Sequence, residues 1–80
     1  MVIHVLAFGI AKEILENESL QFDLQGAATV SNLKTLLEKQ YPGLKKLGSY
    51  LVAVNNEYSG NETSINANDE IALIPPVSGG

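Results

Sequence analysis

The side chains of this sequence offer little material for catalysis. His4 is the only histidine, and there is no cysteine. Ser-His-Asp, Cys-His and multi-histidine metal sites all need partners that are missing, and a disulfide framework or thiolate zinc site is excluded. Glu13, Glu16 and Glu18 cluster, but carboxylates without a histidine nearby are typical of solvated surface. We therefore expect no metal site and no bound cofactor.

The C-terminal residues are a better candidate for chemistry. The sequence ends in Pro75-Pro76-Val77-Ser78-Gly79-Gly80. Two glycines lose much entropy when ordered and bury nothing, so they contribute little to stability. Without side chains, however, they can pass through a narrow tunnel into a partner's active site. The Gly80 carboxylate is ionised at neutral pH and becomes an acyl donor only after activation, for example as an acyl-adenylate. A frayed end or a cloning remnant is the alternative.

Size and charge exclude several classes of function. Eighty residues, 45% hydrophobic and 18% charged, make one small globular domain with a thin core and no room for a deep cleft. The net charge is −4, there is no arginine, and Lys45-Lys46 is the only basic pair. This balance argues against nucleic-acid binding and favours a basic partner surface.

The start Met1-Val2-Ile3-His4 lacks a basic n-region, and no apolar run approaches the roughly 20 residues that span a bilayer. We expect a cytoplasmic protein that binds no membrane.

Four segments have the patterns of strands. Residues 2–8 are apolar on both faces, which is typical of a strand inside a sheet. Residues 19–24 alternate between apolar and polar and are expected to pair antiparallel with the first strand. Residues 51–54 and 70–74 complete the set, and Pro75 ends the last strand because proline cannot donate to a ladder. Residues 55–60 predict a small hairpin.

Two segments have the patterns of helices. Residues 10–15 predict one or two turns, with Ile10 and Ile14 four apart but no good N-cap. The main helix is predicted at about 30–41, after Thr29 as N-cap and before Pro42-Gly43. Lys34 and Glu38 lie on its polar side. Its apolar side holds Val30, Leu33, Leu36, Leu37 and Tyr41.

The order of these elements predicts a two-layer α+β domain. One substantial helix between two pairs of strands must cover one face of the sheet. A crossover through this helix places the first and last strands side by side and parallel. That is the β-grasp (ubiquitin-like) arrangement, with a mixed sheet of four to five strands. We expect the domain to span residues 1–76 and residues 77–80 to form a flexible tail.

The face of the sheet away from the helix is a candidate partner surface. If Ile3, Val5, Ile71 and Leu73 face the helix, then Leu6, Phe8 and Ile74 lie on the opposite face. We expect Val52 or Val54 beside them. No second helix is predicted to cover this face, and an uncovered apolar patch on a small protein usually marks an interface.

The sequence resembles the small subunits of molybdopterin synthase, a family of ubiquitin-like sulfur carriers. The specific part is Pro75-Pro76-Val77-Ser78-Gly79-Gly80 after the strand at 70–74, and the elements upstream are similar in kind and order. The sequence departs from the family at Asn68, where glycine is frequent. We predict a left-handed turn residue there, because asparagine tolerates that conformation.

This resemblance implies a β-grasp fold and a sulfur cycle at Gly80. An adenylating enzyme of the ubiquitin-activating class would use ATP to activate Gly80, and sulfur would replace AMP to give a thiocarboxylate. The large synthase subunit would receive the tail and use the sulfur to build the dithiolene of molybdopterin from cyclic pyranopterin monophosphate. Gly79 would allow delivery, and residues 75–78 would contact the partner. The chain would thus not be an enzyme by itself.

Three other functions stay open on the sequence. A sulfur carrier for thiamine biosynthesis is the nearest, although such carriers tend to be shorter and lack the Pro-Pro-Val-Ser exit. A ubiquitin-like protein modifier would join the same glycine to lysines. A plain interaction module would carry the tail incidentally, and would tolerate a few residues added after Gly80.

Overall fold

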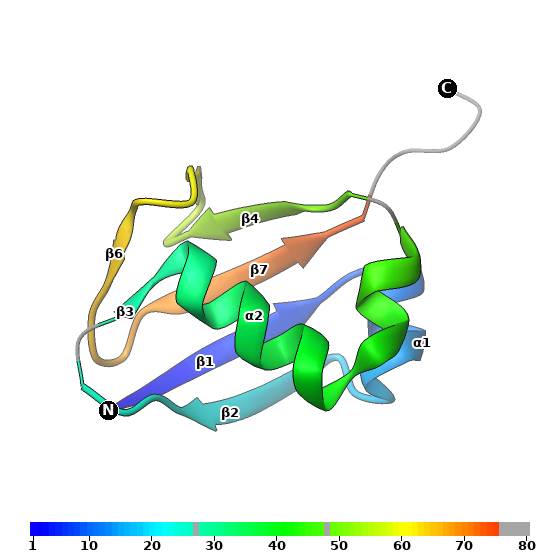
Figure 1. Cartoon of the computed structure of the whole chain (residues 1–80), viewed down its shortest axis with the longest axis horizontal. Coiled ribbons are helices and arrows are strands. Elements are labelled where there is room, and N and C mark those ends of the chain that lie inside the picture. Colours follow the sequence, from blue (N-terminus) through cyan, green and yellow to red (C-terminus); the bar gives the residue numbers. More distant parts are fainter. Residues whose placement is uncertain (27, 48, 76–80) are drawn as a thin grey trace.

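The structure is a computed structural model that describes residues 1–26, 28–47 and 49–75. In these residues the predicted two-layer α+β fold is confirmed (Figure 1). One sheet has the strand order β2-β1-β7-β4-β5, and α2 lies across one of its faces. Its strands are β1 (Val2–Ala7), β2 (Ser19–Asp23), β4 (Leu51–Val54), β5 (Glu57–Tyr58) and β7 (Glu70–Ile74). The helices are α1 (Ile10–Leu15), α2 (Val30–Gln40) and the 3-10 helix η1 (Pro42–Leu47).

The centre of the sheet is a parallel pair made by the first and last of these strands. In β1 and β7, Val5 lies opposite Ile71 and Ala7 opposite Leu73. The strand β2 adds antiparallel to the outer side of β1, as predicted, and β4 adds antiparallel to β7. A second, two-stranded sheet of β3 (Ala28–Thr29) and β6 (Ser64–Ile65) was not predicted, nor was η1. Strands of two residues are too short to produce a periodic pattern.

The hydrophobic core lies between the sheet and the helices. Ile3, Val5, Ile71 and Leu73 have no exposed surface, so the predicted inner face is confirmed. Each such side chain stabilises the fold by about 1.5–3 kcal/mol through removal from water. The helices complete this layer with Ala11 and Leu15 from α1, Val30, Leu33 and Leu37 from α2, and Leu44 from η1.

The boundaries of α2 follow from its caps. Thr29 Oγ1 accepts from the backbone N–H of Asn32 (3.3 Å), and Asn32 Oδ1 accepts from the backbone N–H of Thr29 (2.9 Å), which completes a capping box. The helix ends at Gln40, with Tyr41 as C-cap and Pro42 next. The predicted N-cap is therefore confirmed, and the predicted end differs by one residue.

Two details of the predicted helix faces are wrong. Leu36 is 41% exposed, because it lies at the edge of the apolar stripe and turns away from the sheet. Ile10 is also exposed, and α1 buries Ala11 and Leu15 instead. Gly43 lets η1 approach α1 closely, since a Cβ at this position would lie 3.1 Å from Ile14 Cγ2.

Lys34 and Glu38 both contact Tyr50, which enters the core just before β4. The Tyr50 hydroxyl donates to Glu38 Oε2 (2.7 Å), and Lys34 Nζ lies 5.0 Å from the centre of the ring. Burial, and then the hydrogen bond to Glu38 and its charge, raise the pKa of Tyr50 above its usual range. These contacts attach α2 to the segment that leads into the sheet.

Asparagines form the tight turns. Asn55 and Asn56 both have positive φ (50° and 71°) in the two-residue connection of β4 to β5, the pattern of a type I′ hairpin. Asn68 has φ 67°, so the left-handed conformation predicted there is confirmed. Within the described residues, no helix is long and apolar enough to cross a membrane.

The capping box gives a first testable prediction. Thr29→Ala removes both side-chain hydrogen bonds of Thr29, so we expect the free energy of unfolding to fall by about 1 kcal/mol. Thr35→Ala, in the same helix, loses only a bond from its hydroxyl to the Ser31 carbonyl and should change it by less than about 0.5 kcal/mol. Urea unfolding followed by circular dichroism measures both. Equal effects of the two substitutions would contradict this account of the helix start.

Candidate functional site

The candidate site begins where the chain leaves the sheet. The strand β7 ends at Ile74, as predicted from the proline that follows it, and Pro75 is half-buried at the end of the strand. Pro76, Val77, Ser78, Gly79 and Gly80, which carry the predicted chemistry, lie outside the described residues. The predicted boundary between a domain at 1–76 and a tail at 77–80 therefore stays a prediction.

The parallel pairing of β1 and β7 brings the end of β1 to this exit. The backbone N–H of Phe8 donates to the carbonyl of Leu73 at 3.3 Å. Gly9 comes next, and its missing side chain leaves room for Pro75, because a Cβ on Gly9 would lie 3.3 Å from Pro75 Cγ. The ends of β1 and β7 thus bring Phe8 and Gly9 beside Ile74 and Pro75.

In the described part of the chain, an apolar surface that no helix covers extends from the exit across the face of the sheet opposite α2. The strand register places Leu6 beside Ala72, Ile74 beside Leu51, and Ala53 beside Tyr58. On this face, the side chains of Phe8, Leu51 and Tyr58 are exposed to solvent by 50%, 55% and 71%. We call this surface the outer patch; it consists of Leu6, Phe8, Leu51, Ala53, Tyr58, Ala72 and Ile74.

The prediction for this face is right for three residues and wrong for two. Leu6, Phe8 and Ile74 lie on the outer face, as expected from their alternation with buried neighbours. Val52 and Val54 are buried in the core, because the register pairs them with Leu73 and Ile71. Leu51 and Ala53, the other two residues of β4, lie on the outer face instead.

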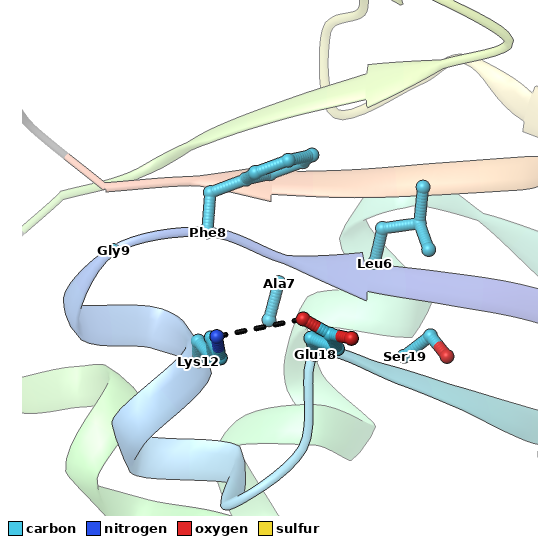
Figure 2. Close-up of a pocket in the computed structure, with 7 residues that line it drawn as sticks. All are labelled: Leu6, Ala7, Phe8, Gly9, Lys12, Glu18 and Ser19. Atoms are coloured by element: carbon cyan, nitrogen blue, oxygen red, sulfur yellow. Dashed lines mark ion pairs between the residues drawn. The ribbon is translucent and has the colours of Figure 1, made fainter.

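Phe8 separates two hollows on this face. One, of about 420 Å³, is bordered by Leu6, Gly9 and Ser19 and by an ion pair of Lys12 Nζ with Glu18 Oε2 at 3.4 Å (Figure 2). The other, of about 250 Å³, lies over Ala53, Ala72 and Ile74, with Asn56 and Tyr58 at its border. Figure 2 shows the Phe8 ring extending from the end of β1 towards β7. Both hollows lie beside the exposed ring of Phe8.

The charged groups near the patch are solvated. Both members of the Lys12–Glu18 pair are exposed, so the pair contributes little to stability. His4 is also exposed on the outer face, opposite Gln21 of β2 and Glu70 of β7. Among the described residues, no three of the types that ligate metals are grouped to hold an ion. The described part of the site therefore consists of an apolar surface bordered by solvated charges.

The central parallel pair, the strand order and the helix across one face define a β-grasp domain of the ubiquitin-like class. A model of the ThiS family matches residues 5–80, and the chain belongs to this family. The molybdopterin synthase sulfur carrier subunit of Dictyostelium discoideum is 42% identical over 80 residues, covering 95% of this chain and 93% of the relative.

Two solved structures have a similar fold. The complex of subunits 1 and 2 of the molybdopterin-converting factor from Helicobacter pylori contains a chain 29% identical to this one, with a TM-score of 0.70 and complete coverage of both chains. The small archaeal modifier protein 1 of Haloferax volcanii is 26% identical with a TM-score of 0.83, over 95% of this chain and 98% of that one.

A second prediction tests whether the outer patch is needed for folding. Phe8→Ala removes a ring that is already half in water, so we expect the free energy of unfolding to fall by less than about 1 kcal/mol. Ile71→Ala, on the inner face of β7, should lower it by about 2–5 kcal/mol, because it leaves a cavity. Chemical denaturation of both variants makes the comparison. Equal losses would show that Phe8 belongs to the core.

Proposed function

We propose that the chain is the sulfur-carrier subunit of a molybdopterin synthase, with its reactive group on Gly80. The observation that carries the proposal is the 42% identity, over nearly the full length of both chains, to a molybdopterin synthase sulfur carrier subunit. The Gly79-Gly80 end supplies the acyl group. The subunit is not an enzyme by itself and donates sulfur inside a complex.

The proposed cycle starts with an adenylating enzyme of the ubiquitin-activating class, which holds ATP; none is bound by the carrier. A carboxylate oxygen of Gly80 attacks the α-phosphorus of ATP, and pyrophosphate leaves. A hydrosulfide equivalent then attacks the acyl carbon, the bond to the AMP oxygen breaks, and a thiocarboxylate remains. Activation is necessary because a free carboxylate does not react with sulfur nucleophiles.

The large synthase subunit is the proposed acceptor of the loaded tail. There each loaded carrier supplies one of the two sulfur atoms of the dithiolene that is built from cyclic pyranopterin monophosphate, and water releases the acyl group as the Gly80 carboxylate. A pocket in the partner protects the thioacid from hydrolysis until it reacts. Gly79 keeps the tail thin enough to enter such a pocket, and Pro76, Val77 and Ser78 contact its entrance.

The outer patch is the proposed docking surface for the large subunit. It is continuous with the exit of the tail at Ile74 and Pro75, so one partner can cover the patch and receive the tail together. Its uncharged centre and exposed aromatic rings match the composition of interface cores. The complex from Helicobacter pylori, in which one chain is similar to this protein and is bound to a second subunit, supports a partner of this kind.

A protein modifier is the second candidate, and the similarity to the small archaeal modifier protein 1 favours it. The first step would be the same adenylate at Gly80. A lysine amine of another protein would then attack the acyl carbon in place of sulfur, AMP would leave, and an amide bond would form. The two functions differ in the product on Gly80, which can be measured directly.

The third prediction concerns this product. After incubation with ATP, the activating enzyme and a sulfide source, intact-protein mass spectrometry should find the mass gain of one oxygen exchanged for sulfur, mapped to Gly80. Deletion of Gly80 should abolish the gain without changing stability, and Gly79→Val should slow it. Gly60→Val, at an open surface position, is the control and should react like the parent. A fully active Gly80 deletion would refute the acyl-carrier function, and a mass shift on lysines of other proteins would favour the modifier.

The fourth prediction concerns the docking surface. Phe8→Asp and Ile74→Asp should each weaken binding of the large subunit by about 2 kcal/mol, roughly thirtyfold in Kd, because a charge would be buried at the centre of the interface. Leu36→Asp is the matched control, since Leu36 is an exposed apolar residue on the helical side. Calorimetric titration of the folded variants measures the three affinities. Parent-like binding by both patch variants, or an equal loss in the control, would refute this docking surface.

A further inference from the structure

Pro75, the last described residue before the reactive tail, packs against Gly9. A Cβ on Gly9 would lie 3.3 Å from Cγ of the Pro75 ring, which is closer than such atoms ordinarily approach. The absence of a side chain at residue 9 therefore determines where this ring can lie. The hydrogen bond from Phe8 N–H to the Leu73 carbonyl holds the two chain segments in register just before the contact.

The backbone of Gly9 is itself fixed. The N–H of Ala11 donates to the carbonyl of Phe8 at 3.1 Å, which closes a β-turn with Gly9 at its second position. The φ of 55° and ψ of −132° at Gly9 are those of a type II′ turn, which glycine adopts without strain. The same turn starts α1, so Gly9 cannot move away from Pro75 without disturbing the helix.

The backbone of Pro75 is restricted on both sides. A proline ring fixes its own φ, and Pro76 restricts Pro75 to extended conformations. With both backbone angles limited, Pro75 has little freedom to absorb a shift of its ring by rotating its own backbone.

We propose that Gly9 is a positioning residue for the C-terminal tail: the space left by its missing side chain seats the Pro75 ring and aims the tail out of the sheet towards the active site of a partner. This inference rests on the proposed function, because it assigns Gly9 a part in delivering Gly80 for activation. Gly9 touches no reacting atom and acts only through Pro75.

The chain contains a matched control for this role. Gly26 also has positive φ (68°), but a Cβ there would meet no atom within 4 Å. Gly9→Ala and Gly26→Ala therefore both strain the backbone, and only the first displaces Pro75. The reaction to follow is ATP-dependent thiocarboxylation by the activating enzyme, measured by intact mass at several carrier concentrations.

We expect Gly9→Ala to lower kcat by about tenfold relative to Gly26→Ala, with KM for the carrier nearly unchanged, since the substitution displaces Pro75 and leaves the rest of the folded domain as it was. Pro75→Ala removes Cγ, the ring atom that a side chain on residue 9 would meet. It should therefore abolish the effect of Gly9→Ala on kcat. In a Pro75→Ala background, adding Gly9→Ala should therefore change kcat by less than about twofold.

Equal rates for Gly9→Ala and Gly26→Ala would overturn the inference, as would an undiminished effect of Gly9→Ala in the Pro75→Ala background. If Gly9→Ala does not fold, Gly9→Asn and Gly26→Asn replace the pair, because asparagine tolerates positive φ and brings the same Cβ. Failure of both Gly9 variants to fold beside folded Gly26 variants would assign Gly9 to stability alone. A parent chain that gains no sulfur would instead overturn the proposed function, and the inference with it.

Discussion

The parallel pairing of β1 with β7 is the constraint on which the rest of the structure depends. It places the first and last strands of the described chain at the centre of the sheet, where Ile3, Val5, Ile71 and Leu73 form the floor of the core. Because side chains alternate across a strand, the same pairing sends Leu6 and Ile74 to the opposite face. It also places the end of β7 and Pro75 beside Phe8 and Gly9.

Most of the fold was predictable because its signals are local. Alternation along residues 70–74, the Thr29 cap and the Asn68 turn each depend on a few neighbouring residues, and each is confirmed. The faces of β4 were assigned wrongly, since alternation separates Val52 and Val54 from Leu51 and Ala53 but does not say which pair faces the helix. That choice is made by the register with β7, a pairing between segments distant in the sequence.

In the candidate site, too, some features are predictable from local sequence and others depend on pairing between distant segments. The Gly79-Gly80 end, the proline exit, and the outer positions of Phe8 and Ile74 follow from residue types and alternation. Leu51 and Tyr58 were missed because their exposure depends on the β4–β5 hairpin and its register. The contact of Gly9 with Pro75 joins opposite ends of the chain, and neither residue type predicts the other.

The central strand pair also has a kinetic consequence. A capped helix and a two-residue hairpin can form early, whereas β1 and β7 meet only after nearly the whole chain has closed into a loop. The outer patch draws on β1, β7 and β4, so it exists only when this last step is complete. An unfolded or truncated chain can display the same Gly-Gly sequence without displaying the patch. On the proposed docking, a large subunit that needs both the patch and the tail accepts sulfur only from folded carriers, so its recognition of the sheet excludes unfolded chains.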